Sequence, residues 1–254
     1  MNIIQYDVRD RIGFITLNRP DKRNALNEEL IQGLSATFDR ASNDPSVKVI
    51  ILKANGEAFC SGADLGYLQN LQNFSFDDNL ADSTRLKELF NKIYTLNKIV
   101  IAQVEGHAIA GGCGLATVCD FIFSVPEAKF GYTEVKIGFI PAIVMVFLIR
   151  KIGDQKARQL LLSGNLVSAQ ESGLTFRIAN KESIADEAID FANKLIKSNS
   201  QQAMATTKQM IAEVQSLPLE EALNYAARMN ANARGTEDCK KGVASFLNKQ
   251  TPEW

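Results

Sequence analysis

Histidine and cysteine are scarce in this sequence: its 254 residues include one histidine and four cysteines. No two cysteines form a Cys-x-x-Cys pair, and a lone histidine cannot complete a zinc site with them, so we expect no metal centre. The wide spacing of the cysteines predicts reduced thiols at Cys60, Cys113, Cys119 and Cys239. A Ser-His-Asp or Cys-His mechanism would depend on His107 alone, where a packed or hydrogen-bonded histidine is the favoured interpretation.

Neither an excess of one charge nor a long apolar run is present. The 28 basic and 29 acidic side chains leave a formal net charge of −1, and the lysines and arginines form no stripe or tail. We therefore expect no nucleic-acid partner and no membrane partner. The chain begins without the basic and apolar regions of a secretory signal, and no apolar run is long enough to span a bilayer. A cytoplasmic location is the resulting expectation.

Apolar residues are abundant and follow two different periodicities. They make up 46% of the chain, which is enough for a sizeable core. Up to about residue 140, short runs such as VIILKA and IVIAQV alternate with helical patterns, which predicts an α/β fold with a largely parallel sheet. From Pro141 onward helical spacing dominates. We predict an α/β core over residues 1–195 and a helical C-terminal region over 196–254.

Two loops of small residues each follow a predicted buried strand: FCSGADL at 59–65 and GHAIAGGCG at 106–114. The carboxyl ends of parallel strands meet at one edge of a sheet, so both loops are expected there. A glycine pair that opens a helix exposes N–H groups without intrahelical partners. If the N–H groups of Ala63 and Gly111 point to one place, they form an oxyanion hole. The alternative interpretation is that both loops are tight packing turns.

Five segments, taken together and in order, resemble one known family. They are NRPDKRNAL, FCSGADL, GHAIAGGCGLATVCD, FGYTEVKIGFIPA and GVASFLNK. In order and spacing they resemble the crotonase superfamily of enoyl-CoA hydratases and isomerases, over essentially the whole chain. The resemblance implies a spiral of ββα units with a helical C-terminal trimerisation region, an acyl-CoA thioester substrate, and a homotrimer or dimer of trimers. No separate cofactor is implied, because coenzyme A is part of the substrate.

The same resemblance assigns roles to individual residues. It places the oxyanion hole at the backbone N–H groups of Ala63 and Gly111, and it places Arg23, Ala25 and Leu26 along the adenine and phosphates of coenzyme A. Lys249 resembles a C-terminal lysine that reaches the coenzyme A of a neighbouring subunit. The other residues that it implies to be substrate-binding are Ser61, Gly62, Asp64, Leu65, Gly114, Pro141 and Phe246.

Glu134 is the predicted proton carrier. Family hydratases commonly have two glutamates, and Glu134 matches the second, while Gly114 stands at the position of the first. Partial burial would raise the pKa of Glu134 and make it a better general base; the alternative is an exposed acid that caps the next helix. We expect Gly114 to leave room for a bulky acyl group or a second water. With one carboxylate, hydration, double-bond isomerisation and catalytically quiet acyl-CoA binding all remain open.

The segment EVKIGFIPAIVMVFLIRKIG, which begins at Glu134, resembles a bacterial subgroup of hydratases that act on branched glutaconyl-CoA esters. We therefore predict an enoyl-CoA hydratase, with 3-methylglutaconyl-CoA as the expected substrate. That substrate carries an additional carboxylate that should need a cation, and three alternatives stay open for it: Lys136, Arg85 or neither. Asp120, at the start of a predicted strand, is expected to be structural.

Overall fold

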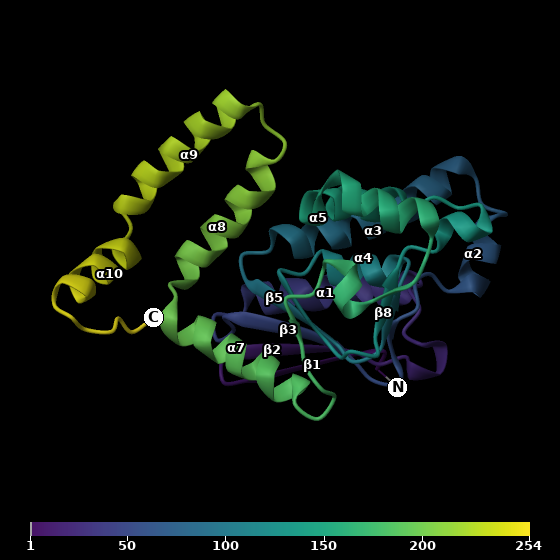
Figure 1. Ribbon diagram of the computed structural model, residues 1–254, viewed down its shortest axis with the longest axis horizontal. Coiled ribbons are helices and arrows are strands. Elements are labelled where there is room, and N and C mark those ends of the chain that lie inside the picture. Colours follow the sequence, from purple (N-terminus) through teal and green to yellow (C-terminus); the bar gives the residue numbers. More distant parts are fainter. Residues whose placement is uncertain (1) are drawn as a thin grey trace.

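The structure, a computed structural model, describes residues 2–254 and contains two β-sheets surrounded by helices (Figure 1). A six-stranded sheet has the order β1-β2-β3-β5-β7-β10, and a four-stranded sheet has the order β4-β6-β8-β9. The strands are β1 Ile4–Arg9, β2 Ile12–Leu17, β3 Val49–Ala54, β4 Ala58–Cys60, β5 Ile99–Val104, β6 His107–Ile109, β7 Phe121–Ser124, β8 Lys129–Gly131, β9 Val167–Ser168 and β10 Arg177–Ile178. The predicted α/β class is confirmed.

The larger sheet forms the centre of the core. Strands β1 and β2 are antiparallel, and β2, β3, β5, β7 and β10 run parallel to one another. Every residue of β2 and β5 is buried, as expected for parallel strands that are covered on both faces. The continuous apolar runs of the sequence therefore mark the innermost strands.

Helices enclose the sheets and then extend away from them. The α-helices are α1 Glu28–Asn43, α2 Leu65–Leu71, α3 Phe76–Thr95, α4 Gly111–Thr117, α5 Ala142–Ser163, α6 Ala169–Ser172, α7 Ile184–Ser198, α8 Gln201–Val214, α9 Leu219–Arg234 and α10 Glu237–Leu247. Two short 3-10 helices are η1 Pro20–Lys22 and η2 Glu134–Ile137. Figure 1 shows α3, α4 and α5 on one side of the strands and α7 on the other.

The C-terminal helices α8 to α10 project from the body of the molecule (Figure 1). Helices α9 and α10 contain no buried residue, so their apolar side chains lie largely at the surface. Residue 195, where we placed the boundary between core and helical region, lies within α7. Within residues 2–254, no helix is both long and apolar enough to cross a membrane.

A buried ion pair joins α8 to the large sheet. The Lys208 ammonium lies 2.7 Å from Asp120 Oδ2 and donates to the carbonyl of Lys98 at 3.0 Å. Asp120 Oδ2 also accepts from the backbone N–H of Val100 at 2.7 Å. The Lys208 side chain is only 6% exposed, so Asp120 links two strands and one helix at a place with little water.

Replacing Lys208 with methionine is expected to lower the free energy of unfolding by about 2–4 kcal/mol, because the half-buried Asp120 carboxylate loses its partner. Urea denaturation measures the change. The matched control is Lys240→Met, which removes an exposed pair with Glu237 at 2.7 Å and should cost less than about 1 kcal/mol. Equal effects of the two substitutions would contradict the anchoring role of Lys208.

Candidate active site

Three adjacent parallel strands of the smaller sheet end at the same edge. In the register, Cys60 of β4 lies opposite Ala108 of β6, and Ile109 of β6 lies opposite Gly131 of β8. The next segments along the chain are the loop 61–64, helix α4 and helix η2. The sequence-predicted donors Ala63 and Gly111 and the predicted acid/base Glu134 therefore emerge side by side, at the edge where parallel sheets form ligand crevices.

The segment 61–64 is held in place by the segment 23–26. The Leu26 N–H donates to the Gly62 carbonyl at 2.7 Å, and the Asp64 N–H donates to the Leu26 carbonyl at 2.8 Å. This bridge pairs Leu26 with Ala63 in parallel orientation, an arrangement in which the polar groups of Ala63 itself point away from Leu26. Among residues 2–254 the Ala63 N–H has no hydrogen-bond acceptor.

Helix α4 begins from a strained residue. Ala110 has φ 51° and ψ −125°, a region that residues with a side chain seldom adopt, and its N–H donates to the Gly131 carbonyl at 2.7 Å. Gly111 is the first residue of the helix, so its N–H has no intrahelical partner. In the described part of the chain no other acceptor is recorded for it. Strain in a short segment that positions a free N–H is typical of a functional site.

The two donor loops are in direct contact. Gly62 has φ +92°, and a Cβ built on it would lie 3.5 Å from the Gly111 nitrogen and 2.9 Å from Ala110 Cβ. A Cβ on Gly112 would lie only 2.2 Å from the Cys60 carbonyl oxygen. The small residues thus permit close backbone contact between the two loops, as the packing interpretation proposed. If the N–H groups of Ala63 and Gly111 point to one place beside this contact, they suit an oxygen that gains negative charge.

Glu134 is buried next to α4. It is 9% exposed, and its Oε2 is buried without a hydrogen-bond partner in the described structure. Burial raises the pKa of this carboxyl. Its charge reaches Cys113 in the first turn of α4: burial is the main cause that raises the Cys113 pKa to about 12, and Glu134 adds to the shift. The alternative of an exposed capping acid is wrong, because Glu134 lies inside.

Replacing Glu134 with glutamine is expected to stabilise the fold near neutral pH. The folded-state pKa is raised, so the folded protein holds this proton more tightly than the unfolded chain does. That stabilisation is complete below the unfolded pKa and is lost as the pH rises through the folded pKa. A Glu134→Gln protein should therefore gain about 1 kcal/mol at neutral pH, as active-site replacements often do, and the gain should shrink on acidification. Thermal unfolding across pH measures this, and a gain independent of pH would contradict it. The control is Glu127→Gln, an exposed site.

The space beside Gly114 is filled, so the expectation of free room there is wrong. A Cβ on Gly114 would lie 2.2 Å from Val144 Cγ1 of α5, 3.1 Å from Val144 Cβ and 3.0 Å from Phe90 Cε2 of α3. Rotation of the Val144 side chain would move Cγ1 but not Cβ, so the contact with Val144 Cβ would remain. Helices α3 and α5 thus close the position at which a second carboxylate would start.

The predicted coenzyme A and acyl contacts occupy different parts of the molecule. The Arg23 side chain is exposed, and its backbone is in the left-handed region with φ 49°. The Leu26 side chain lies against Gly111. The Asp64 carboxylate is bound within the protein by Arg19 and by N–H groups of α2. The other predicted substrate-binding residues outside the C-terminal helices differ in exposure: Ala25 and Gly62 are buried, Ser61 and Pro141 are half-buried, and Leu65 is exposed.

Phe246 and Lys249 lie far from this edge. Phe246 belongs to α10, Lys249 follows it, and both are exposed. In Figure 1, α10 and α2 are at opposite ends of the molecule. One chain alone does not bring these two residues to Glu134.

The two candidate cations for a substrate carboxylate have other contacts. Arg85 Nη2 lies 3.3 Å from Glu28 Oε1 and 3.4 Å from Asp82 Oδ1. Lys136 is exposed, and its methylene groups lie 3.2 Å from a Cβ built on Gly164. Arg85 therefore pairs with two acids through Nη2, while its Nε is buried without a partner in the described structure.

Sequence reasoning missed Arg19 and Tyr67. Arg19 binds Asp64, and Tyr67 donates to Asp82 at 2.5 Å. Their partners are distant along the chain, so no local pattern identified them.

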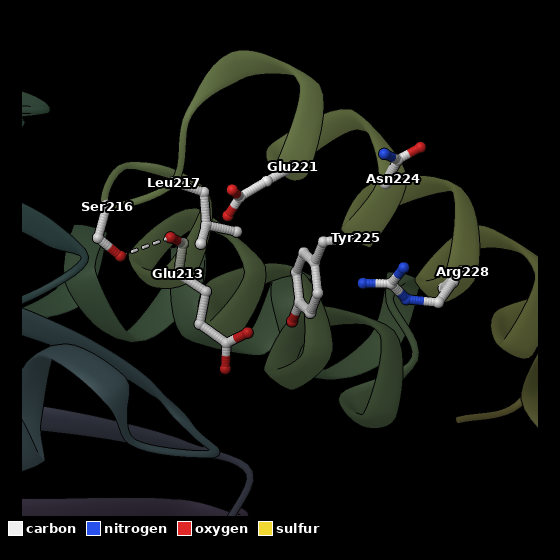
Figure 2. A pocket seen from close by; sticks show the side chains of 7 residues that line it. All are labelled: Glu213, Ser216, Leu217, Glu221, Asn224, Tyr225 and Arg228. Atoms are coloured by element: carbon white, nitrogen blue, oxygen red, sulfur yellow. Dashed lines mark hydrogen bonds between the residues drawn. The ribbon is translucent and has the colours of Figure 1, made fainter.

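Two hollows lie away from this edge. One, of about 440 Å³, is at the turn between α8 and α9, where Figure 2 shows Tyr225 between Glu213 and Arg228. The other, of about 1410 Å³, lies between α8–α10 and the core. Neither is lined by a predicted site residue. Residues 2–254 also contain no group of three or more His, Cys, Asp or Glu side chains placed to hold a metal ion.

Comparison with known proteins gives consistent results. The profile of the enoyl-CoA hydratase/isomerase family matches residues 7–254. A putative enoyl-CoA hydratase of Thermus thermophilus is 37% identical over 249 residues, which are 97% of this chain and 98% of that protein. A solved structure of a putative enoyl-CoA hydratase/isomerase (crotonase) of Legionella pneumophila is 34% identical, with a TM-score of 0.87 over 98% of both chains. An enoyl-CoA hydratase structure of Mycobacterium smegmatis is 29% identical, with a TM-score of 0.92 over 100% of this chain and 99% of that one. These likenesses confirm the predicted α/β spiral.

Proposed function

The chain belongs to the enoyl-CoA hydratase/isomerase family, and we propose that it hydrates the 2,3 double bond of an enoyl-CoA thioester with Glu134 as its only acid/base. One observation carries this proposal: a buried carboxyl with an unpartnered oxygen follows β8, and the neighbouring strands β6 and β4 lead to two backbone N–H groups that have no acceptor among residues 2–254. Coenzyme A enters as part of the substrate, and no separate cofactor is proposed.

In the proposed mechanism the thioester oxygen accepts hydrogen bonds from the N–H groups of Ala63 and Gly111. Glu134, as the carboxylate, takes a proton from a water molecule while the water oxygen forms a bond to C3. The electrons of the double bond move toward the thioester, whose oxygen becomes negative and is stabilised by the two donors. The protonated Glu134 then delivers its proton to C2. One H and one OH have been added, and the carboxylate is restored.

As the acyl group we propose 3-methylglutaconyl, on the basis of the sequence likeness that begins at Glu134. Its distal carboxylate distinguishes it from crotonyl-CoA. Arg85 Nη2 already binds Glu28 and Asp82, whereas Lys136 is exposed and forms no ion pair within residues 2–254. The relative rates with the two esters therefore test the acyl assignment directly.

We also propose that the active protein is a homotrimer or a dimer of trimers in which Phe246 and Lys249 reach the coenzyme A bound by a neighbouring subunit. Their exposure, and the position of α10 at the opposite end of the molecule from α2 (Figure 1), support this proposal. The exposed apolar residues of α9 and α10 agree with it; they include Leu219, Leu223, Val243 and Leu247. Light scattering of the purified protein measures the assembly, and a monomer at assay concentration would contradict the proposal.

Isomerisation is the second candidate, because a single carboxylate can take a proton from one carbon and return it to another. The two reactions are distinguished by incubating the protein with crotonyl-CoA, 3-methylglutaconyl-CoA and a 3-enoyl-CoA while recording the absorbance of the conjugated enoyl thioester. A decrease with either of the first two supports hydration, and an increase with the third supports isomerisation. No change with any ester, despite measurable binding, would favour an acyl-CoA-binding protein.

A further inference from the structure

An ion pair joins the two segments that surround the Ala63 donor. Arg19 Nη2 lies 2.9 Å from Asp64 Oδ2, and each side chain is 19% exposed. Through its other terminal nitrogen, Nη1, Arg19 donates to the Ala25 carbonyl at 3.0 Å. One guanidinium therefore spans the segments 23–26 and 61–64, and its rigid planar shape fixes both contacts at once.

Both carboxylate oxygens of Asp64 are used. Oδ2 binds Arg19, while Oδ1 accepts from the N–H groups of Gly66 at 3.0 Å and Tyr67 at 3.3 Å and so caps helix α2. Burial pushes the Asp64 pKa upward, but the N–H of Tyr67 and the Arg19 side chain outweigh it and hold the pKa below its usual value. Asp64 is therefore ionised and fixed immediately after Ala63.

Arg19 is itself fixed by a buried side chain. Asn24 is 0% exposed and its Oδ1 accepts from the Arg19 N–H at 2.8 Å. The Asn24 amide donates to the carbonyls of Asn55 and Ala58, each at 2.9 Å. The arginine backbone is thus tied to the loop before β4 and to β4 itself, which gives the ion pair a rigid base.

We infer that Arg19 and Asp64 act as positioning residues that orient the Ala63 N–H toward the thioester oxygen; neither touches the reacting atoms. This inference rests on the proposed function. Residues 62 and 64 have their backbone groups bonded to Leu26, so the plane of the Ala63 peptide follows the spacing of the two segments. The Arg19–Asp64 pair sets that spacing from outside the donor site.

An oriented donor has its largest effect on the transition state, where the oxygen is most negative. A displacement of about 1 Å in a catalytic group reduces rates by about 100-fold, even when it arises from a distant substitution. Loosening the pair should therefore lower kcat more than it raises KM. If the pair only stabilised the fold, its loss would lower the unfolding midpoint. The apparent kcat would then fall only in proportion to the fraction of protein that is unfolded.

The test uses Arg19→Met and Asp64→Asn in the full-length protein. Asparagine keeps the cap of α2 and removes the charge. Arg19→Lys keeps the charge but cannot make both contacts of the guanidinium. Arg158→Met is the matched control, because it removes an exposed ion pair with Asp154 at 2.8 Å. Circular dichroism at the assay temperature reports folding for each protein.

Two readouts are recorded: kcat and KM for hydration of crotonyl-CoA, and the absorbance maximum of a bound 3-aryl-2-enoyl-CoA, which moves to longer wavelength when its carbonyl is polarised. For Arg19→Met and Asp64→Asn we expect kcat to fall about 10- to 100-fold, KM to change less than about threefold, and the wavelength shift to shrink. Arg19→Lys should give intermediate values and Arg158→Met wild-type values.

The outcomes separate this inference from the proposed function. A wild-type protein that shifts the bound probe but hydrates nothing contradicts hydration, while the size of the shift in the variants still tests the pair. Folded Arg19→Met and Asp64→Asn proteins with wild-type kcat and wild-type shift overturn the inference. So does unfolding of both variants, since the pair would then be structural. A wild-type protein with neither hydration nor shift overturns both proposals.

Discussion

A Glu134→Gln protein is expected to lose hydration activity by on the order of 10³- to 10⁴-fold in kcat, the upper range for removal of an acid/base group. The effect is this large because one carboxyl handles both protons of the reaction, at the water and at C2. Glutamine has nearly the same shape but neither accepts nor delivers a proton at this step. Initial rates with crotonyl-CoA and with 3-methylglutaconyl-CoA measure the loss.

Binding should survive this substitution. The dissociation constant for the unreactive saturated ester butyryl-CoA, measured by calorimetry, is expected to stay within about threefold of the wild-type value, because a change in kcat without a change in binding removes an interaction made only in the transition state. Glu127→Gln, on the exposed turn between β7 and β8, is the control and should keep full activity. A Glu134→Gln protein that keeps a tenth or more of the activity would contradict the assignment of Glu134.

The second large effect is expected at Gly114. Replacing it with alanine places a Cβ 2.2 Å from Val144 Cγ1 and 3.1 Å from Val144 Cβ, so helices α4 and α5 must separate. Overpacking of this kind costs about 1–3 kcal/mol, and we expect the upper part of that range because Gly114 and Val144 are both buried. Urea denaturation measures the loss.

A double-mutant cycle with Gly114→Ala and Val144→Ala identifies the neighbour responsible. Val144→Ala alone leaves a small cavity and should also destabilise the protein. In the double variant the methyl group added by Gly114→Ala occupies the space that the Val144 side chain vacates. The double variant should therefore be more stable than the sum of the single losses predicts, by about 1 kcal/mol or more. Additive losses would show that Val144 does not close this position.

Much of the fold followed from short patterns. The continuous apolar runs VIILKA and IVIAQV became β3 and β5 at the centre of the parallel sheet. Such runs are informative because a strand buried on both faces needs apolar residues at successive positions. Residue 195, where we placed the boundary, lies inside α7, which continues to Ser198. Helical periodicity shows that a helix exists and does not show whether it packs on the core.

The candidate site was predictable to the same extent. Ala63 and Gly111 were placed together because both follow parallel strands, and the register of β4 and β6 brings their loops into contact. The burial of Glu134 was expected from its apolar surroundings. The role of Arg19 was not, because its partner Asp64 is remote in sequence and an arginine before a proline is an ordinary surface residue until its contacts are known.

The sequence by itself determined the order of the strands and helices, the small residues that leave the N–H groups of Ala63 and Gly111 uncovered, and the single carboxyl that follows β8. These are local properties: strand periodicity, backbone freedom and residue chemistry act over a few neighbouring positions. Only the tertiary structure decided that Val144 and Phe90 fill the space beside Gly114 and that Arg19 binds Asp64. Those contacts join residues that are distant along the chain, and their distances are fixed only when the helices and sheets pack together.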